Sequence, residues 1–517
     1  MTEATLPAAL PAGAGAHSPQ RAMLGLAGIF LAAMLAGLNN RVGAIALPDV
    51  RGALGFGLDD ASWLTTVYSV GELIAMPFSA WFAITFSVRR FELCMIAVCT
   101  LLALLAPFVR NLELLLALRF VQGVASGTMI PVLMMAALKF LPPNIRLHGL
   151  ALYALTATFA PNVSIWLAGY WSDGLSDWRW IYWQVIPLAA LAAWLVAIGL
   201  PSEPVQRDRF AQANWPGMLC GVPGFALLAI TLDQGIRLDW FNSPLIVTTG
   251  VAGLALLALY LLTEWYHPAP FIKLQILGRR NLGLGFSLFV VLLVVMTSGT
   301  LLPMNYLAAI QGYRPAQMAQ IGLSIALPQL VLGSLVAVLL YRRWVDARLV
   351  FAGGLLLIAT ACFLGAHLDA SWNRDQFVLQ QALQALGQPM AVVAMLFLCT
   401  SVVQPHEGPF VSGNINTLRA VGSLLGGAVV GQLIVVRQRF HSDMLLDQAG
   451  LSAGTHPLAF DPTQLMAYTG AQSLVLSVAD AYRVLGALAL LMVPFVLSMT
   501  FIPAPDLSGK KAAGSGA

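Results

Sequence analysis

The chain has 517 residues, of which 59% are hydrophobic and only 10% are charged, whereas about 25% are charged in an ordinary soluble domain. Polar side chains are too few to cover a water-soluble globule, so a soluble protein is excluded. The net charge of +4 comes from scattered lysines and arginines with no basic run longer than two residues, so we expect no nucleic-acid partner.

Residues 1–22 are rich in Ala, Pro and Gly and lack the basic start of a secretory signal, so they predict a disordered tail. From Met23 onward, apolar runs near 20 residues recur, and about 20 residues are what a membrane-spanning helix needs. The pattern predicts an all-α polytopic membrane protein with 14 spans. The expected spans are Met23–Leu47, Ser62–Ile84, Phe91–Phe108, Leu112–Phe140, Leu147–Tyr170, Trp180–Leu200, Trp215–Leu232, Leu245–Glu264, Leu282–Ile310, Ala316–Tyr341, Leu349–His367, Phe377–Thr400, Phe410–Val436 and Tyr482–Ile502.

Lysine and arginine are distributed unevenly between the two sets of loops that alternate along these spans. The set that includes both tails holds 15 of them and the opposite set holds 9. Cytoplasmic loops carry the excess of positive charge in membrane proteins. We therefore expect both termini in the cytoplasm and the chain in a plasma membrane, which in a bacterium is the inner membrane.

The segment Leu116–Pro131 combines a charge with small residues inside an apolar run. Arg119 would cost at least about 2.5 kcal/mol in hydrocarbon, so it should face a protein interior or a watery cavity. Gly123 and Gly127 would let a neighbouring helix approach closely. This combination suits a transport pathway, although a purely structural arginine bonded to backbone carbonyls would have the same pattern.

Signatures of enzymes and of ATP-driven pumps are missing from the sequence. No Walker lysine or nucleotide-binding loop occurs, and the five cysteines lie in apolar runs without metal-ligand spacing. The sequence therefore predicts no enzyme, no metal site and no cofactor.

Several short motifs occur in a characteristic order. They are Leu38–Pro48, Leu118–Gly123, Trp178–Pro187, Gly312–Pro315 and Asn416–Gly427. Together they resemble the major facilitator superfamily, and within it the fourteen-helix drug:proton antiporter branch. The resemblance implies an N-terminal six-helix bundle (23–200), two extra central helices (201–281) and a C-terminal six-helix bundle (282–502) with an outer loop (437–481), followed by a cytoplasmic tail (503–517). The residues expected to pack helices are Gly123, Gly127, Pro161, Gly422 and Gly426.

Two motifs depart from the family pattern. In the loop that acts as a charge-paired gate latch in the family, only Arg89 and Arg90 remain, and Ser87 stands where a glycine is usual. The helix-five motif, which is associated with antiport, keeps only Pro161 of its glycine-flanked proline. The first departure implies that the gate latch is weakened or replaced. The second weakens the case for antiport and leaves that for transport unchanged.

Four ionisable residues lie well inside the expected spans: Arg41, Glu72, Arg119 and Arg419. In the family fold, the first three share one bundle, so we expect them to meet in its outer half. Glu72 could be a protonatable carboxylate whose arginine partners also attract the substrate. Alternatively, Arg41 and Glu72 could form a permanent buried ion pair.

The excess of positive charge inside the spans favours a substrate with an acid group. Polar contacts in the pathway, or between helices, are expected from Asn39, Asn40, Asn305, Gln329 and Asn416. The segment from Arg437 to Ala481 suggests an amphipathic outer hairpin or helix. By analogy with related exporters, it is a candidate contact for a periplasmic adaptor protein.

These features together predict a secondary transporter that works by alternating access. We expect proton-coupled efflux of a small amphipathic or anionic organic compound, with Glu72 as the proton-coupling residue. Two alternatives stay open. One is a uniporter or importer of an organic anion, and the other is a non-transporting sensor or scaffold in the membrane.

Overall fold

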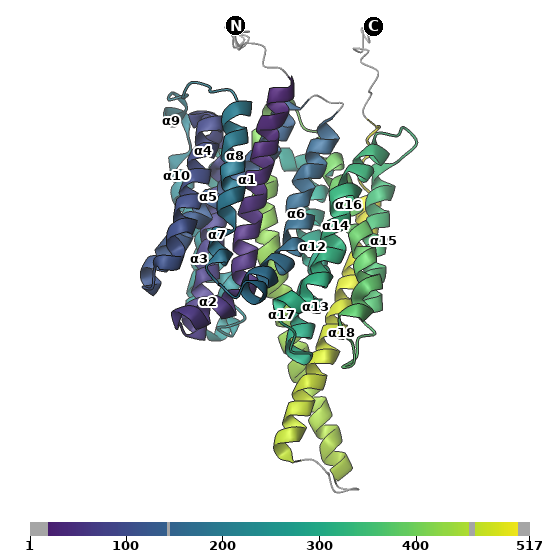
Figure 1. Cartoon of the computed structure of the whole chain (residues 1–517). Coiled ribbons are helices and arrows are strands. Elements are labelled where there is room, and N and C mark those ends of the chain that lie inside the picture. The colour runs from purple at the N-terminus through teal and green to yellow at the C-terminus, as the bar shows by residue number, and fades with distance from the viewer. Residues whose placement is uncertain (1–18, 142–144, 454–460, 505–517) are drawn as a thin grey trace.

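The computed structural model describes residues 19–141, 145–453 and 461–504 (Figure 1). Its α-helices are α1 (Pro19–Ile45), α2 (Leu47–Leu54), α3 (Leu58–Phe86), α4 (Val88–Leu105), α5 (Leu112–Phe140), α6 (Arg146–Gly169), α7 (Trp180–Trp183), α8 (Val185–Gly199), α9 (Arg209–Gln212), α10 (Trp215–Gln234), α11 (Pro244–Tyr266), α12 (Arg280–Met296), α13 (Leu301–Ile310), α14 (Pro315–Leu340), α15 (Ala347–Gly365), α16 (Val378–Thr400), α17 (Gly408–Ala453) and α18 (Pro462–Leu497). Short helical turns are η1 (Ala106–Phe108), η2 (Tyr170–Gly174), η3 (Trp240–Asn242), η4 (Leu274–Gly278), η5 (Thr297–Gly299), η6 (Arg374–Phe377) and η7 (Pro405–Glu407).

Within the described residues, 14 helices are long and apolar enough to cross a membrane, which confirms the predicted fold class. Twelve of the predicted spans agree with these helices to within a few residues. The exceptions are the last two spans, where the predicted outer loop (437–481) is largely helical. There α17 continues to Ala453 and α18 begins at Pro462, and the intervening residues 454–460 lie outside the described part of the chain.

The helices form two groups that meet along a seam. Helices α1 and α3–α8 pack together on one side, and α12–α18 pack together on the other (Figure 1). Across the seam, α6 packs against α14, and α3 packs against α17. We call the end where α1 begins the terminus side and the opposite end the far side.

Glycines allow some helices to touch backbone to backbone. A Cβ atom at Gly123 of α5 would lie 2.2 Å from the carbonyl oxygen of Tyr68, and one at Gly127 would lie 2.3 Å from that of Glu72. Any larger side chain would force α3 and α5 apart. The two glycines therefore determine the distance of the Glu72 backbone from α5.

On the other side of the seam, Gly422 and Gly426 of α17 lie against α12. A Cβ atom at Gly422 would lie 2.9 Å from Leu293, and one at Gly426 would lie 3.1 Å from Thr297. The span made by α12 and α13 is interrupted between them at η5. Such breaks free backbone and side-chain polar groups where a membrane helix borders a cavity.

The extra helices α10 and α11 pack on the outside of the seam. Helix α10 contacts both α3 and α17. The Thr66 hydroxyl of α3 donates a hydrogen bond to Asp233, and the amide of Gln234 donates to Thr66. These polar contacts attach the extra pair to the first bundle.

Helices α17 and α18 project as a hairpin beyond the other helices on the far side (Figure 1). Asp480 of α18 joins them at the base of this hairpin. Its carboxylate accepts hydrogen bonds from Arg437 at 2.7 Å and from Arg483 at 2.6 Å, and it lies 2.7 Å from His441 Nε2.

Candidate functional site

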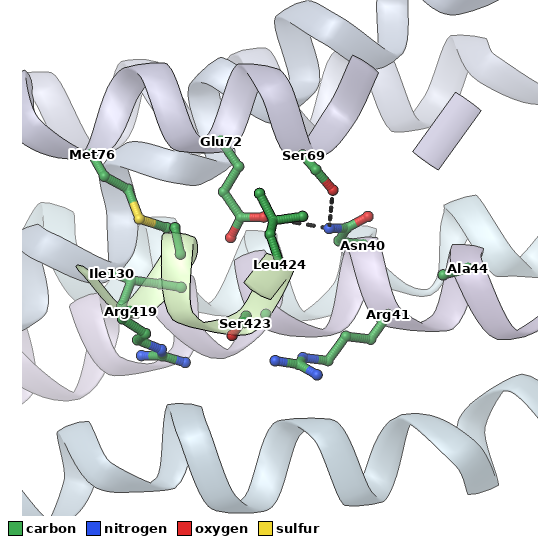
Figure 2. A pocket seen from close by; sticks show the side chains of 12 residues that line it. Asn40, Arg41, Ala44, Ser69, Glu72, Met76, Ile130, Arg419, Ser423 and Leu424 are labelled. Carbon is green, nitrogen blue, oxygen red and sulfur yellow. Dashed lines mark hydrogen bonds between the residues drawn. The ribbon is translucent and has the colours of Figure 1, made fainter. Parts of the chain in front are cut away.

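A cavity of about 180 Å³ lies at the seam, between α1, α3 and α5 of the first bundle and α17 of the second. Figure 2 shows a carboxylate, Glu72, on one side and two guanidinium groups, those of Arg41 and Arg419, turned toward each other on another. The polar lining of the cavity also includes Asn40, Ser69 and Ser423. A cavity with these charges at the junction of two helical bundles is where an alternating-access carrier holds its substrate.

Glu72 lies near the middle of α3, where close packing against Gly127 positions its backbone. Its side chain accepts one hydrogen bond, from the Asn40 amide at 3.4 Å, and that amide also donates to Ser69 at 3.3 Å (Figure 2). The contact with Glu72 is long and the Asn40 amide divides its donors between two acceptors, so the carboxylate is held weakly. A carboxylate with so few partners in a cavity is free to exchange a proton or to contact a ligand.

Arg41 lies one turn before the end of α1. Within the described residues, its guanidinium has no hydrogen-bond acceptor and no carboxylate within 4.0 Å, although it shares the cavity with Glu72. The permanent Arg41–Glu72 ion pair, one of the two alternatives from the sequence, is therefore not formed in this structure. An unpaired charge in a membrane protein cavity is costly, which makes Arg41 a candidate for contact with a ligand.

Arg419 bridges the two bundles from α17. Its guanidinium donates to the side-chain and backbone oxygens of Thr156 in α6, the latter at 2.5 Å, and it lies 5.7 Å from the centre of the Tyr153 ring. One face of Arg419 thus joins the bundles while the residue also lines the cavity. Any ligand that attracts Arg419 acts directly on a contact across the seam.

Arg119 comes near α1, where a Cβ atom at Gly43 would lie 3.3 Å from its guanidinium, but it is not grouped with Arg41 and Glu72 in the cavity lining as expected. It is buried, donates to Gln122 at 2.8 Å, and lies 4.3 Å from the centre of the Tyr68 ring and 5.6 Å from that of Tyr182. It does not line the cavity. Helical spacing alone could not reveal this, because it does not fix which face of α5 turns toward α17.

A second cavity of about 90 Å³ adjoins the first and shares Arg41 and Ser423 with it. It lies between α1, α6, α12, η5, α16 and α17. Its polar lining is neutral apart from Arg41. The lining includes Pro161, Asn162, Thr297, Thr300 and Gln388.

The other predicted polar residues have different environments. Asn39 is buried and donates to the Tyr68 hydroxyl at 3.3 Å, and Gln329 donates to the Ala385 carbonyl at 3.0 Å, which joins α14 to α16. Asn416 accepts from the Tyr153 hydroxyl across the seam at 2.9 Å. Asn305 is exposed on α13 and lines neither cavity.

The predicted gate loop is a single connecting residue, Ser87, between α3 and α4. Its φ of 75° lies in the left-handed region, which explains why glycine is usual there. The Ser87 hydroxyl accepts from the Glu203 amide at 3.2 Å. Arg89 and Arg90 make no hydrogen bond or ion pair with the described residues.

Ion pairs close the seam on the far side. Arg314, just before α14, lies 2.8 Å from Asp49 in α2 and 2.5 Å from Asp173 in η2. Hydrogen bonds to Asp49 and then to Asp173 raise the pKa of Arg314 above its usual value. We call these three residues the far-side lock.

Polar contacts join the bundles on the terminus side as well. The Ser412 hydroxyl of α17 donates to the Pro131 carbonyl of α5 at 2.6 Å, and the Leu147 amide donates to the Tyr341 hydroxyl at 3.2 Å. The bundles therefore touch on both sides of the charged cavity.

Ser69, Ser423, Asn162 and Gln388 were not identified as site residues from the sequence. Gln380, Gln384 and Gln388 follow each other at four-residue intervals and so share one face of α16. That spacing was the available signal for Gln388. Nothing comparable marked the two serines.

Residues 29–427 match the model of the Major Facilitator Superfamily. This match spans more than half of the chain, and it agrees with the 14 helices and the cavity at the seam. The chain belongs to this superfamily and is a multi-pass secondary membrane transporter.

Named relatives include resistance and export proteins of bacteria. The chain is 25% identical over 412 residues to the fatty acid resistance protein FarB of Neisseria gonorrhoeae, with 80% of each protein covered. It is 27% identical over 417 residues to the probable multidrug resistance protein EmrY of Escherichia coli, again with 80% of each covered. It is 24% identical over 422 residues to the multidrug export protein EmrB of Haemophilus influenzae, with 81% of each covered.

Solved structures share the fold at low sequence identity. The human organic anion transporter MFSD10 superposes with a TM-score of 0.55 at 14% identity and covers 93% of this chain and 100% of its own. The peptide transporter POT superposes with a TM-score of 0.56 at 15% identity and covers 91% of this chain and 94% of its own. These likenesses support the fold alone.

Proposed function

We propose that this protein exports a small amphipathic organic acid in exchange for protons, with Glu72 as the proton site. The observation that carries the proposal is one weakly held carboxylate facing two guanidinium groups in a cavity at the seam. Arg41 and Arg419 would hold the acid group of the cargo. The relatives are named for resistance and export, which supports the outward direction.

The charges determine which way proton and cargo are coupled. When Glu72 loses its proton, it weakens the attraction of the two arginines for an anion, so an anion held by the arginines alone would travel together with a proton. Exchange requires the cargo also to donate a hydrogen bond to the Glu72 carboxylate, because a charged acceptor binds a donor more strongly than a protonated one. We therefore propose a cargo that touches both the arginines and Glu72.

Alternating access would use the contacts at the two ends of the seam. Opening on the far side breaks the far-side lock, and opening on the terminus side breaks contacts such as Ser412–Pro131. Arg419 both lines the cavity and joins the bundles across the seam. Cargo binding would therefore change the relative stability of the states that are open on the far side and on the terminus side.

We propose further that the terminus side is cytoplasmic and that the membrane is a bacterial inner membrane, as the distribution of lysine and arginine favours. The hairpin of α17 and α18 would then project into the periplasm. It exposes Phe440, Met444, Leu451, Met466 and Tyr468. Exposed apolar residues beyond the membrane helices suit a protein partner, such as a periplasmic adaptor.

The adaptor proposal is tested by replacing Phe440 and Met444 together with Ser. If the hairpin recruits a partner, resistance of whole cells falls while flux in proteoliposomes, where no partner is present, stays at the wild-type level. Equal resistance of variant and wild-type cells contradicts a role for these side chains in partner binding.

The exchange function is tested by flux in proteoliposomes with an imposed pH gradient. The probes are labelled decanoate, a carboxylate without a hydrogen-bond donor, and labelled N-benzoylserine, a carboxylate with an amide N–H and a hydroxyl, with ethidium as a cation. We expect the gradient to drive flux of N-benzoylserine, which can donate to Glu72, in the wild type. The substitution Glu72→Gln should abolish that response and leave exchange of labelled for unlabelled carboxylate intact, whereas Glu113→Gln, the same change at an exposed residue, should have no effect.

Other results would identify the alternatives. Carboxylate flux that ignores the gradient in the wild type means a uniporter. Transport of ethidium without any carboxylate contradicts an acid cargo. The absence of flux for all three probes contradicts the proposed activity and favours a sensor or scaffold.

A further inference from the structure

Two buried amides from opposite bundles line the second cavity. Asn162 lies on α6 of the first bundle and is 2% exposed, and Gln388 lies on α16 of the second and is 1% exposed. The side-chain oxygen of each has no hydrogen-bond partner among the described residues. Leaving such an acceptor unpaired costs about 1–3 kcal/mol, so each amide oxygen favours a donor.

The orientation of Asn162 is determined by its own helix. Its amide nitrogen donates to the Thr158 carbonyl at 2.5 Å. Because a carbonyl accepts only from a donor, the nitrogen must face Thr158 and the side-chain oxygen must be the free atom. A Cβ atom at Gly322 of α14 would lie 2.1 Å from the Asn162 carbonyl, so this part of α6 is held tightly against α14.

The orientation of Gln388 follows from a chain of hydrogen bonds that ends on a backbone carbonyl. The Ser298 hydroxyl donates to the Val295 carbonyl at 2.7 Å and accepts from the Gln384 amide nitrogen at 2.9 Å. The Gln384 oxygen then accepts from the Gln388 nitrogen at 3.2 Å. Each hydroxyl or amide in this chain has one orientation that makes these hydrogen bonds. In that orientation the Gln388 oxygen is an acceptor without a donor among the described residues.

We infer that the second cavity binds an uncharged N–H or O–H donor of the cargo, a different group from the donor proposed for Glu72, on the same molecule whose acid group lies in the first cavity. Arg41, shared by both cavities, disfavours an ammonium group there, and the two amide oxygens disfavour a second carboxylate. The cargo would therefore be an acid with two such donors, one for Glu72 and one for the second cavity, such as an N-acyl serine, in preference to a plain fatty acid. This inference rests on the proposed function, because it assumes an acid cargo in the first cavity.

Matched ligands separate the donor from the rest of the molecule. Hippurate carries a carboxylate and an amide N–H, and in O-benzoylglycolate an ester oxygen replaces that N–H with little change in size. Mandelate and phenylacetate differ in the same way by one hydroxyl. Binding is measured as the ligand-dependent rise in Tm of the purified full-length protein in detergent, titrated to give an apparent Kd.

We expect the wild type to bind the donor member of each pair about tenfold more tightly, the ratio that about 1.4 kcal/mol represents. In Asn162→Leu and Gln388→Leu, this preference should fall toward unity. The matched control is Gln381→Leu, the same change at a buried glutamine of α16 that does not line the cavity, and its preference should equal that of the wild type. The preference is a ratio within one variant, so a general loss of stability does not change it.

The remaining outcomes are distinct. Equal binding of both members of each pair to the wild type overturns the inference and leaves the acid cargo intact. A preference that survives in Asn162→Leu and Gln388→Leu but is lost in Glu72→Gln overturns it as well, because the donor would then lie on Glu72. If no carboxylate of either pair raises the Tm of the wild type, the proposed acid cargo itself is contradicted, and the inference falls with it.

Discussion

Arg41 and Arg119 both lie inside membrane helices, but their surroundings differ. Arg119 is buried against two aromatic rings and donates to Gln122 at 2.8 Å. Arg41 lines both cavities and has no hydrogen bond or ion pair among the described residues. Arg119 therefore has the surroundings of a residue that packs the bundle, whereas Arg41 has those of a residue retained for its charge.

Replacing each of the two arginines by methionine separates these roles. Arg41→Met removes an unpaired charge, so we predict an unchanged or higher stability, by about 1 kcal/mol, together with loss of carboxylate binding. Arg119→Met leaves the Gln122 oxygen without its donor, so stability should fall by about 1–3 kcal/mol. Thermal unfolding and hippurate binding, measured on both variants, check this. A larger loss of stability in Arg41→Met than in Arg119→Met would contradict the assignment.

The sequence alone identifies most of the charged residues of the site, but it does not show which of them lie together. Arg41, Glu72 and Arg419 were singled out because ionisable residues inside spans are rare. The contact partners were not predictable, since the rotation of each helix about its axis depends on packing. Gly127 against Glu72 and Gly322 against Asn162 are such packing contacts, and they involve residues far apart in the chain.

At the scale of elements, α17 is the longest helix described and serves three purposes. Its first turns close the seam on the terminus side, the turns that follow contribute Arg419 and Ser423 to the cavities, and its last turns form the hairpin. Glu407, directly before it, anchors its beginning. The Glu407 carboxylate lies 2.6 Å and 2.8 Å from the two terminal guanidinium nitrogens of Arg279, which precedes α12.

The stabilisation that the Arg279–Glu407 pair gives to the folded state depends on pH. Burial alone would raise the pKa of Glu407, but the hydrogen bonds from Arg279 outweigh it and lower that pKa below its usual value. The carboxylate therefore stabilises the folded state at neutral pH, and this contribution is lost as the pH falls through the lowered pKa.

We predict that Glu407→Gln lowers the free energy of unfolding at neutral pH by about 1–3 kcal/mol. The difference between wild type and variant should shrink progressively as the pH is lowered into the acid range. Tm values of both proteins along a pH series provide the measurement. A difference that stays constant with pH would mean that the ion pair contributes nothing.

Length and hydropathy predicted the membrane elements well, because a helix must span a bilayer of nearly constant thickness. The same reasoning ended the span of α17 near Val436, where Arg437 and Arg439 begin a polar stretch. The helix nevertheless continues, since Asp480 of α18 pairs with Arg437 and holds the two helices together beyond that point. Such a long-range pair leaves no local signal in the sequence.

At the scale of the whole molecule, the charged cavity lies between contacts on both sides of the seam. The far-side lock is partly exposed, with 58% of the Arg314 side chain accessible. Exposed ion pairs contribute roughly 0.2–1 kcal/mol each. The lock therefore shifts the equilibrium between a closed and an open far side toward the closed state, but it does not prevent opening.

We predict that Arg314→Gln raises the labelling rate of a cysteine at Ala44, a residue that lines the first cavity, by about two- to fivefold. The label is a thiol reagent that cannot cross the membrane, applied from the far side to a protein whose five native cysteines have been replaced. Arg51→Gln, on the same side but outside the lock, should label at the unaltered rate. Unchanged labelling in Arg314→Gln would show that the lock does not hold the far side closed.

Proton movement on cargo binding tests the exchange of proton and cargo at Glu72 most directly. N-benzoylserine, which carries a hydroxyl as well as an amide N–H, is added to the purified protein in weakly buffered detergent solution across a range of pH, and the change in pH is recorded. We predict that binding releases a proton from the wild type, and that Glu72→Gln binds N-benzoylserine without release. Uptake of a proton by the wild type, or release that persists in Glu72→Gln, would contradict exchange at this carboxylate.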